Sequence, residues 1–235
     1  MSDFDYGSIP VGYYDDVYRR RRGVQSRWHH DKFRLFQGCL KAGERHLDVG
    51  CGPGTFIATL PETVLSTGVD IAAEQIAYAR RANARSGATY ETITPGTLPF
   101  ADGTFDVVSA IELVEHLRGE EISRLVREVY RVLTPGGRAL FSTPNYASLW
   151  PAVEALVNRL GPVSYDGQHV TRLNARTLRE KLADSPWSQL DVRAYQFLAP
   201  FAAALGWRAS EVFARLEPDF LVSRQGLLLF AEARK

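Results

Sequence analysis

The sequence predicts an α/β fold in which a doubly wound, seven-stranded and mostly parallel sheet is covered by helices and by helical lid insertions. Two observations support this fold class. Between residues 45 and 143, short apolar runs alternate with stretches whose apolar residues recur at helical spacing. This alternation is typical of parallel sheets with helices on both faces. Within it, the run FDVVSAI at 105–111 is almost continuously apolar, as expected of a strand buried on both faces.

Strands are expected wherever a short apolar run ends at a glycine, a proline or a polar residue. Such runs occur at 45–49, 64–70, 89–93, 105–111, 138–143, 190–197 and 227–231. Helices are expected at 73–84 and over the apolar positions of 122–133, where the TPGG sequence at 134–137 ends the pattern. The aromatic and basic residues 1–40 are also expected to be helical.

Composition limits the classes of function. The 235 residues suit one domain, and a formal net charge of +1 gives the surface no general field for nucleic acids or acidic membranes. The two cysteines, Cys39 and Cys51, favour a reducing cytoplasm over secretion, and we expect Cys51 to be a small buried side chain. The N-terminus lacks the apolar segment of a signal peptide, and no apolar run is long enough to span a membrane.

The run HLDVGCGPGTF at 46–56 predicts a ligand-binding loop. Gly50, Gly52 and Gly54 follow an expected strand at alternating positions. Glycines let the backbone turn sharply and approach a ligand closely, and the helix that follows offers free N–H groups. Asp70, at the end of the next strand, lies 22 residues after Asp48 and could accept both hydroxyls of a ribose.

A second polar group follows the strand expected at 105–111. Glu112, Glu115 and His116 are three and four positions apart, so they share one face if a helix begins at Glu112. This face would lie beyond the carboxyl ends of the strands, where open α/β sheets bind ligands. A cation between the two carboxylates would remove their repulsion. Metal binding, a metal-free base at His116 and a purely structural role stay open.

Three motifs together resemble the class I S-adenosylmethionine-dependent methyltransferases over about residues 30–145. They are DVGCGPG at 48–54, LPFADGTFDVVSAIELVEHL at 98–117 and TPGGRALFSTPN at 134–145. The resemblance implies a Rossmann-like methyltransferase fold with S-adenosylmethionine as cofactor. It also implies the contacts of that cofactor: its methionine part and ribose would be held by Asp48, Gly50, Gly52, Gly54 and Asp70, and by the backbone of Ile111.

The sequence ExxEH at 112–116, followed by GQH at 167–169, is similar to the ubiquinone-biosynthesis O-methyltransferases. This second resemblance implies a divalent metal, usually magnesium, with four ligands: Glu112, Glu115, His116 and His169. Because two imidazoles are soft ligands for magnesium, manganese, zinc and iron stay open. A histidine that is not a ligand, His116 or His169, would be the catalytic base.

These relatives also carry an aromatic N-terminal helix that closes over the cofactor. We therefore expect Trp28 and one of His29 and His30 to line the pocket, with simple packing of the helix on the domain as the alternative. Arg34 is expected to pair with the cofactor carboxylate. The apolar segment 198–216 is expected to roof the pocket or to form a dimer surface.

The predicted function is the S-adenosylmethionine-dependent methylation of a hydroxyl on a small molecule, such as a sugar, a catechol-like ring or a lipid-linked acceptor. Three alternatives are a metal-free N- or C-methyltransferase with His116 as base, a small-RNA 2′-O-methyltransferase, and a regulator that binds the cofactor without catalysis. The low net charge and the absence of a basic stripe count against an RNA substrate.

The expected organisation is a single methyltransferase domain, 1–235. It would comprise an N-terminal helical lid at 1–40, a cofactor-binding core at 41–143, and substrate-side insertions with the last strands at 144–235. We expect a cytoplasmic enzyme with a small-molecule acceptor and no nucleic-acid partner. A homodimer and a peripheral membrane contact stay open.

Overall fold

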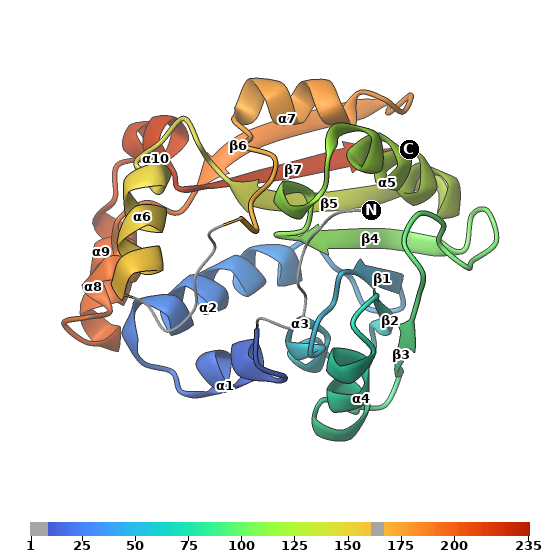
Figure 1. Ribbon diagram of the computed structural model, residues 1–235, viewed down its shortest axis with the longest axis horizontal. Helices are drawn as coiled ribbons and strands as arrows, with labels where there is room; N and C mark the ends of the chain where they lie inside the picture. The colour runs from blue at the N-terminus through green and yellow to red at the C-terminus, as the bar shows by residue number, and fades with distance from the viewer. Residues whose placement is uncertain (1–8, 161–166) are drawn as a thin grey trace.

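The computed structural model describes residues 9–160 and 167–235, and there the chain forms one seven-stranded sheet with helices on both sides (Figure 1). The strand order is β3-β2-β1-β4-β5-β7-β6. β7 runs antiparallel to both of its neighbours, and the remaining pairs are parallel. The strands are β1 (Arg45–Val49), β2 (Leu65–Asp70), β3 (Ala88–Thr92), β4 (Phe105–Ile111), β5 (Leu133–Pro144), β6 (Gln189–Tyr195) and β7 (Leu228–Arg234). The predicted fold class is therefore confirmed.

The helices fall into three groups along the chain. Two precede the sheet, α1 (Tyr13–Arg19) and α2 (Gly23–Gln37). Those among the first strands are α3 (Thr55–Ala58), α4 (Ala73–Ala82), the 3-10 helix η2 (Val114–His116) and α5 (Gly119–Val132). After β5 come α6 (Trp150–Leu160), α7 (Ala175–Leu182), α8 (Ala199–Ala202), α9 (Trp207–Leu216) and α10 (Asp219–Gln225).

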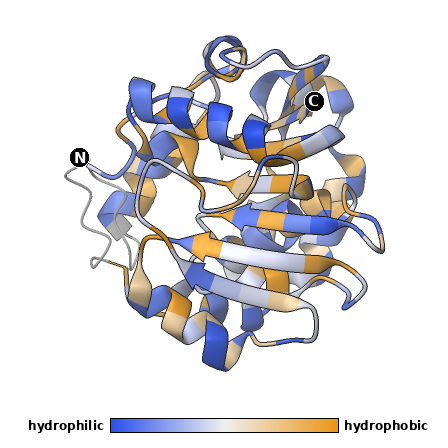
Figure 2. Cartoon of the chain, turned by 90° about the vertical axis from the view of Figure 1, so that its right-hand side faces the viewer, coloured by the Kyte–Doolittle hydropathy of each residue, from blue (hydrophilic) through white to orange (hydrophobic). Residues whose placement is uncertain are grey.

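The central strand β4 separates two apolar layers. Val108 packs in a cluster with Val126 of α5, whereas its neighbour Val107 packs with Phe36 of α2 and Phe56 of α3. Successive side chains of a strand point to opposite faces, which explains why FDVVSAI is almost continuously apolar. Burying each such valine fully contributes about 1.5–3 kcal/mol. Along the helices that cover the sheet, hydrophilic and hydrophobic residues alternate in bands, as in amphipathic helices (Figure 2).

Several element boundaries differ from the prediction; β7, for example, continues to Arg234, three residues beyond its expected end. β5 begins at Leu133, five residues before the expected start, because Leu133 already pairs with Phe105 of β4; the TPGG sequence that follows forms an irregularity in the strand, with Gly136 at a φ of +78°. β6 ends at Tyr195, since the next residue, Gln196, has a φ of +61° and leaves the extended conformation. The N-terminal segment forms two helices, with Arg21 at a φ of +48° in the break between them.

The last third of the chain supplies helices at one end of the molecule (Figure 1). The apolar segment 198–216 folds as α8 and α9. Its Phe201 lines the cavity described below, in agreement with the expected roof. Leu205 and Leu216 are exposed, and a dimer surface there stays a prediction. Within residues 9–160 and 167–235, no helix combines the length and the apolar character needed to cross a membrane.

Candidate active site

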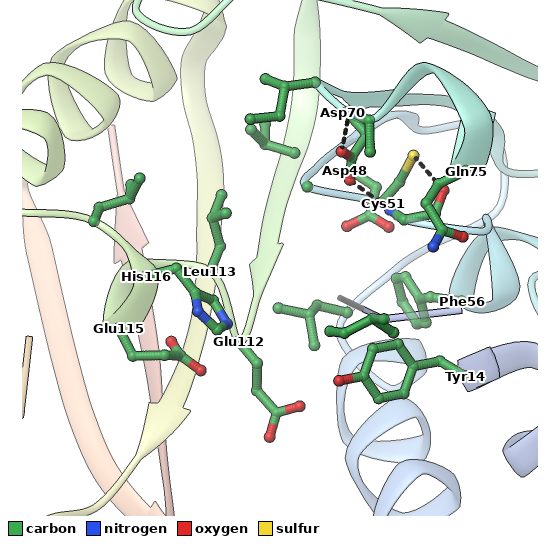
Figure 3. A pocket seen from close by; sticks show the side chains of 18 of the residues that line it. Tyr14, Asp48, Cys51, Phe56, Asp70, Gln75, Glu112, Leu113, Glu115 and His116 are labelled. Atoms are coloured by element: carbon green, nitrogen blue, oxygen red, sulfur yellow. Dashed lines mark hydrogen bonds between the residues drawn. The ribbon is translucent and has the colours of Figure 1, made fainter. Parts of the chain in front are cut away.

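A cavity of about 680 Å³ opens beyond the carboxyl ends of β1, β2 and β4. One wall holds the glycine loop with Asp48 and Asp70, and the other holds Glu115 and His116 (Figure 3). The parallel strands β2, β1 and β4 are neighbours in the sheet, so their polar ends meet at one edge. Ile111, the last residue of β4, lines the cavity between the two walls. The cavity thus joins the two polar groups that the sequence singled out.

The glycine loop and Asp70 hold each other in place. Gly52 N donates a hydrogen bond to Asp70 Oδ2, and Ala72 N donates to Oδ1, each over 2.8 Å. A side chain at Gly52 would meet no atom within 4 Å, because this residue faces the open cavity. Burial raises the pKa of Asp70, and the bonds from the backbone amides oppose that rise. Each carboxylate oxygen keeps a second lone pair, so Asp70 can still accept the two hydroxyls of a ribose.

Gly54 has a different role from the predicted one. It does not line the cavity, and a Cβ at this position would lie 2.6 Å from Cε1 of Tyr90. Its φ of +74° also disfavours any other residue. Gly54 therefore lets the loop pack against Tyr90. The predicted contact between Gly54 and the cofactor does not fit this position.

The N-terminal helix α2 forms part of the cavity wall, but Arg34 does not. Trp28 and His29 line the cavity as expected, together with Lys32. His30 instead stacks on Tyr18 with ring centroids 3.9 Å apart. Arg34 lies on the outer face of α2 with 65% of its side chain exposed. Because Arg34 does not line the cavity, its position gives no support to the predicted pairing with the cofactor carboxylate.

The predicted helical face of Glu112, Glu115 and His116 does not form. Glu112 has a φ of +50°, so the chain leaves β4 through a left-handed residue. The short η2 follows, and α5 begins only at Gly119. As a result, Glu115 and His116 stay together, whereas the Glu112 side chain points away from them (Figure 3).

Glu112 is held by α2 and lies outside the group of metal-binding atoms. Its carboxylate pairs with Lys32, and Trp28 Nε1 donates to it over 3.1 Å. Burial would raise the pKa of Glu112, but Lys32 and His29 outweigh it and lower the pKa to about 2. The carboxylate is thus charged and already neutralised by Lys32. The four-ligand set implied by the sequence loses this member.

The remaining three predicted ligands lie together. One donor atom from each of Glu115, His116 and His169 lies within 4.8 Å of the others. Glu115 is 1% exposed, and neither of its carboxylate oxygens has a hydrogen-bond partner among the described residues. Burial, with the charge of Glu112, raises the pKa of Glu115 to about 8, and burial lowers the pKa of His116 to about 4. The cluster thus lacks a positive charge to stabilise the ionised Glu115.

Both imidazoles are oriented through Nδ1. His116 Nδ1 lies 3.0 Å from the carbonyl oxygen of Gln168, to which only an N–H can donate. His169 Nδ1 contacts the Glu154 carboxylate and lies 2.9 Å from Tyr146 Oη. Neutral rings held in this way carry their proton on Nδ1 and their lone pair on Nε2. Partners of this kind commonly orient histidines that bind a metal.

Sequence reasoning missed Lys32, Tyr146 and Glu154. Lys32 is 3% exposed in a helix that was expected to be a lid, and Glu154 lies in α6, far from any motif. Their spacing in the sequence gives no signal, because each meets its partner only through tertiary packing. The run RWHHDKF at 27–33 does place a lysine one helical turn after Trp28, which could have suggested a shared partner.

Comparisons with known proteins identify a methyltransferase domain in the chain. Residues 47–141 match the family model of the methyltransferase domain. The chain is 35% identical over 108 residues to a ubiquinone biosynthesis O-methyltransferase of Pseudomonas entomophila, covering 44% of this chain and 46% of that one. It is 36% identical over 106 residues to the 27-O-demethylrifamycin SV methyltransferase of Amycolatopsis mediterranei, covering 42% and 38%. The aligned parts thus span less than half the length of these relatives.

Solved structures show the same fold. An S-adenosylmethionine-dependent methyltransferase from Mesorhizobium loti superposes with a TM-score of 0.61 at 22% identity, covering 87% of this chain and 98% of that one. Phosphoethanolamine N-methyltransferase 2 of Haemonchus contortus, in complex with S-adenosyl-L-methionine, gives a TM-score of 0.55 at 20% identity, covering 83% and 49%. The chain thus contains a methyltransferase domain over residues 47–141 and shares the fold of S-adenosylmethionine-dependent methyltransferases.

Proposed function

We propose that this chain transfers the methyl group of S-adenosylmethionine to a hydroxyl of a small molecule, assisted by a divalent cation. The observation that carries the proposal is the cluster of Glu115, His116 and His169, which lines the same cavity as Asp48 and Asp70. The two curated relatives described above are both named as methyltransferases, and the Pseudomonas protein is named as an O-methyltransferase. They support an oxygen acceptor.

The three side chains fit a divalent cation. Glu115 is a buried carboxylate without a hydrogen-bond partner among the described residues, and such a group is costly unless a cation or a proton neutralises it. His116 and His169 present Nε2 lone pairs once their Nδ1 protons are engaged. One carboxylate and two imidazoles favour manganese, iron or zinc over magnesium. We therefore place a transition-metal ion ahead of the magnesium that the resemblance implies.

Bound at this cluster, a divalent cation would supply a Lewis acid that lowers the pKa of an acceptor hydroxyl. The chain itself supplies the geometry. Asp70 and the loop around Gly52, which are hydrogen-bonded to each other, would hold the methyl donor at one side of the cavity. Glu154 and Tyr146 fix the direction of the His169 ring at the other side. Alignment of two reactants in this way removes much of the entropic barrier to methyl transfer.

The walls near His169 favour a flat and largely apolar acceptor. The ring of Trp150 lies with its centroid 6.3 Å from that of His169 and 5.3 Å from that of Trp28. Val153, Val157 and Phe201 also line this part of the cavity. A volume of about 680 Å³ lies within the range of ordinary ligand sites, which is roughly 300–1,000 Å³. We therefore place a hydroxylated ring first among the acceptors and a lipid-linked ring second.

Metal dependence can be measured on the purified chain. Formation of S-adenosylhomocysteine would be followed with a catechol and with a glycoside diol as acceptors, in EDTA and then with manganese, zinc or magnesium added. We expect turnover of at least one acceptor that EDTA abolishes and that manganese or zinc restores better than magnesium. Full turnover in EDTA would contradict the metal. Binding of S-adenosylhomocysteine by calorimetry without turnover of any acceptor would favour the regulator instead.

A further inference from the structure

A line of buried polar side chains crosses the middle of the sheet and ends at Asp48. His46 and Ser109 are fully buried, and Ser66 and Asp48 are 3% and 2% exposed. The strand register explains the line, because His46 of β1 lies beside Ser66 of β2, and Asp48 of β1 lies beside Ser109 of β4. Central strands of parallel sheets are normally apolar, and buried polar groups are costly unless they are hydrogen-bonded. Packing alone therefore does not explain why these buried positions carry polar side chains.

Hydrogen bonds connect these side chains in one continuous series. Arg85 Nη2 donates to Ser66 Oγ over 2.9 Å, and Ser66 Oγ lies 3.3 Å from His46 Nδ1. On the other side of the ring, His46 Nε2 lies 2.8 Å from Ser109 Oγ. Ser109 Oγ donates to Asp48 Oδ1 over 2.6 Å. Only the last of these groups, Asp48, lines the cofactor cavity.

The direction of each bond follows from the last one. The Ser109 hydroxyl has one hydrogen, so once that hydrogen is donated to Asp48 the oxygen must accept from His46 Nε2–H. Burial and the nearby Arg85 lower the pKa of His46 to about 3, so the ring is neutral. Its Nδ1 then carries the lone pair and faces Ser66 Oγ at 3.3 Å, while the Ser66 hydroxyl also donates toward the carbonyl oxygen of Val64 over 3.4 Å. From His46 onward, both donors point toward Asp48.

We propose that Ser66, His46 and Ser109 form a hydrogen-bond relay that keeps the Asp48 carboxylate ionised and aimed at the α-ammonium group of the bound cofactor. The proposal rests on the binding of S-adenosylmethionine in this cavity. Asp48 needs such support, because burial and the charge of Asp70 raise its pKa to about 7, whereas Ser109 and Lys32 act to lower it. The three relay residues do not line the cavity, so their role is to position and polarise Asp48.

A pair of ligands separates this role from a general effect on folding. S-adenosylhomocysteine carries the α-ammonium group, whereas 5′-methylthioadenosine keeps the adenosine and the sulfur but lacks that group. In Ser109→Ala, we expect the affinity for S-adenosylhomocysteine to fall roughly tenfold to a hundredfold, as for loss of one hydrogen bond to a charged group. The affinity for 5′-methylthioadenosine should stay within about twofold. Calorimetry measures both.

Thr67→Val provides the matched control. Its hydroxyl also bonds across two strands of the same sheet, to Thr89 over 3.1 Å, but it has no connection to Asp48. Both ligands should bind this variant as they bind the unaltered chain. Equal losses for the two ligands in Ser109→Ala, or no loss for either, would overturn the relay. Failure of the unaltered chain to bind either ligand would instead overturn the cofactor assignment and the proposed function with it.

Nitrogen-15 NMR tests the relay without any substitution. With S-adenosylhomocysteine bound, we expect the His46 ring to be neutral, with its proton on Nε2 and a pyridine-like signal from Nδ1. A ring protonated on Nδ1 alone would overturn the proposal, because Ser109 would then donate its only hydrogen to Nε2 and could not donate to Asp48.

Discussion

Glu112 and Glu115 are three residues apart, yet they lie in opposite electrostatic environments. Lys32 pairs with Glu112 and lowers its pKa to about 2 against the effect of burial. Among residues 9–160 and 167–235, no lysine or arginine pairs with Glu115, and burial raises its pKa to about 8. The ExxEH motif implies that both glutamates are metal ligands, because residue type and spacing are the same information for each. Only the positive φ at Glu112 and the position of α2 separate them.

The two glutamates therefore make a matched pair for testing the metal ligands. Glu115→Gln should lower the affinity for manganese at least tenfold, since it removes the charged ligand from the cluster. Glu112→Gln should change that affinity by less than about threefold. Calorimetric titration of each variant with manganese measures the difference. Equal losses in the two variants would restore the four-ligand set and contradict the role assigned to Lys32.

The raised pKa of Asp48 makes the free energy of unfolding depend on pH. Its pKa rises from 3.8 to about 7 on folding, so the folded state binds the proton more tightly than the unfolded state does. The free energy of unfolding should therefore fall as pH rises from about 4 to 7, by an amount on the order of a few kcal/mol. Asp48→Asn should remove that fall, so it should stabilise the cofactor-free protein more at pH 8 than at pH 5. Urea denaturation at both values checks this.

Asp106 is the control of opposite sign. Its carboxylate pairs with Arg45, and the hydrogen bond lowers its pKa. The stability that Asp106 contributes is present above its unfolded pKa and is lost as pH falls through the lower, folded value. Asp106→Asn should thus cost stability at pH 8 and less in acid. If Asp48→Asn showed the same trend as Asp106→Asn, the account of Asp48 would be contradicted.

At the scale of elements, α2 couples the N-terminal segment to the cavity. Trp28 and Lys32, one helical turn apart, both reach Glu112 at the end of β4. The resemblance to the ubiquinone-biosynthesis O-methyltransferases was enough to predict that Trp28 and one adjacent histidine would line the pocket. It could not assign Arg34, because the choice of the buried face depends on how α2 docks. The same limit applies to β5, whose early start depends on pairing with β4 at Phe105.

Hydrogen exchange tests the coupling through α2. Binding of S-adenosylhomocysteine should slow amide exchange in α2 and in residues 50–56, because both line the cavity. The control element is α7, whose Leu178 and Leu182 pack on the opposite face of the sheet. Its exchange should not change. Protection confined to residues 50–56, with none in α2, would show that this helix does not respond to the cofactor.

For the whole molecule, the order of the strands explains what the sequence could reveal. Strands β2, β1 and β4 are neighbours, so short motifs at their ends come together without any long-range information. Asp48, Asp70 and Glu115 were predictable for that reason. His169 lies 53 residues beyond His116 and was found only through the resemblance. Glu154 and the Ser66–His46–Ser109 line were not found, because their partners are set by packing and register.

The proposed reaction requires a divalent cation and a methyl donor in one cavity. Anomalous diffraction from a crystal grown with S-adenosylhomocysteine and manganese measures both at once. The predicted result is an anomalous peak at coordination distance from Glu115, His116 and His169, with the cofactor ribose on Asp70 and the Glu112 carboxylate still on Lys32. Density for the cofactor without a peak at the three side chains would contradict the metal-assisted mechanism.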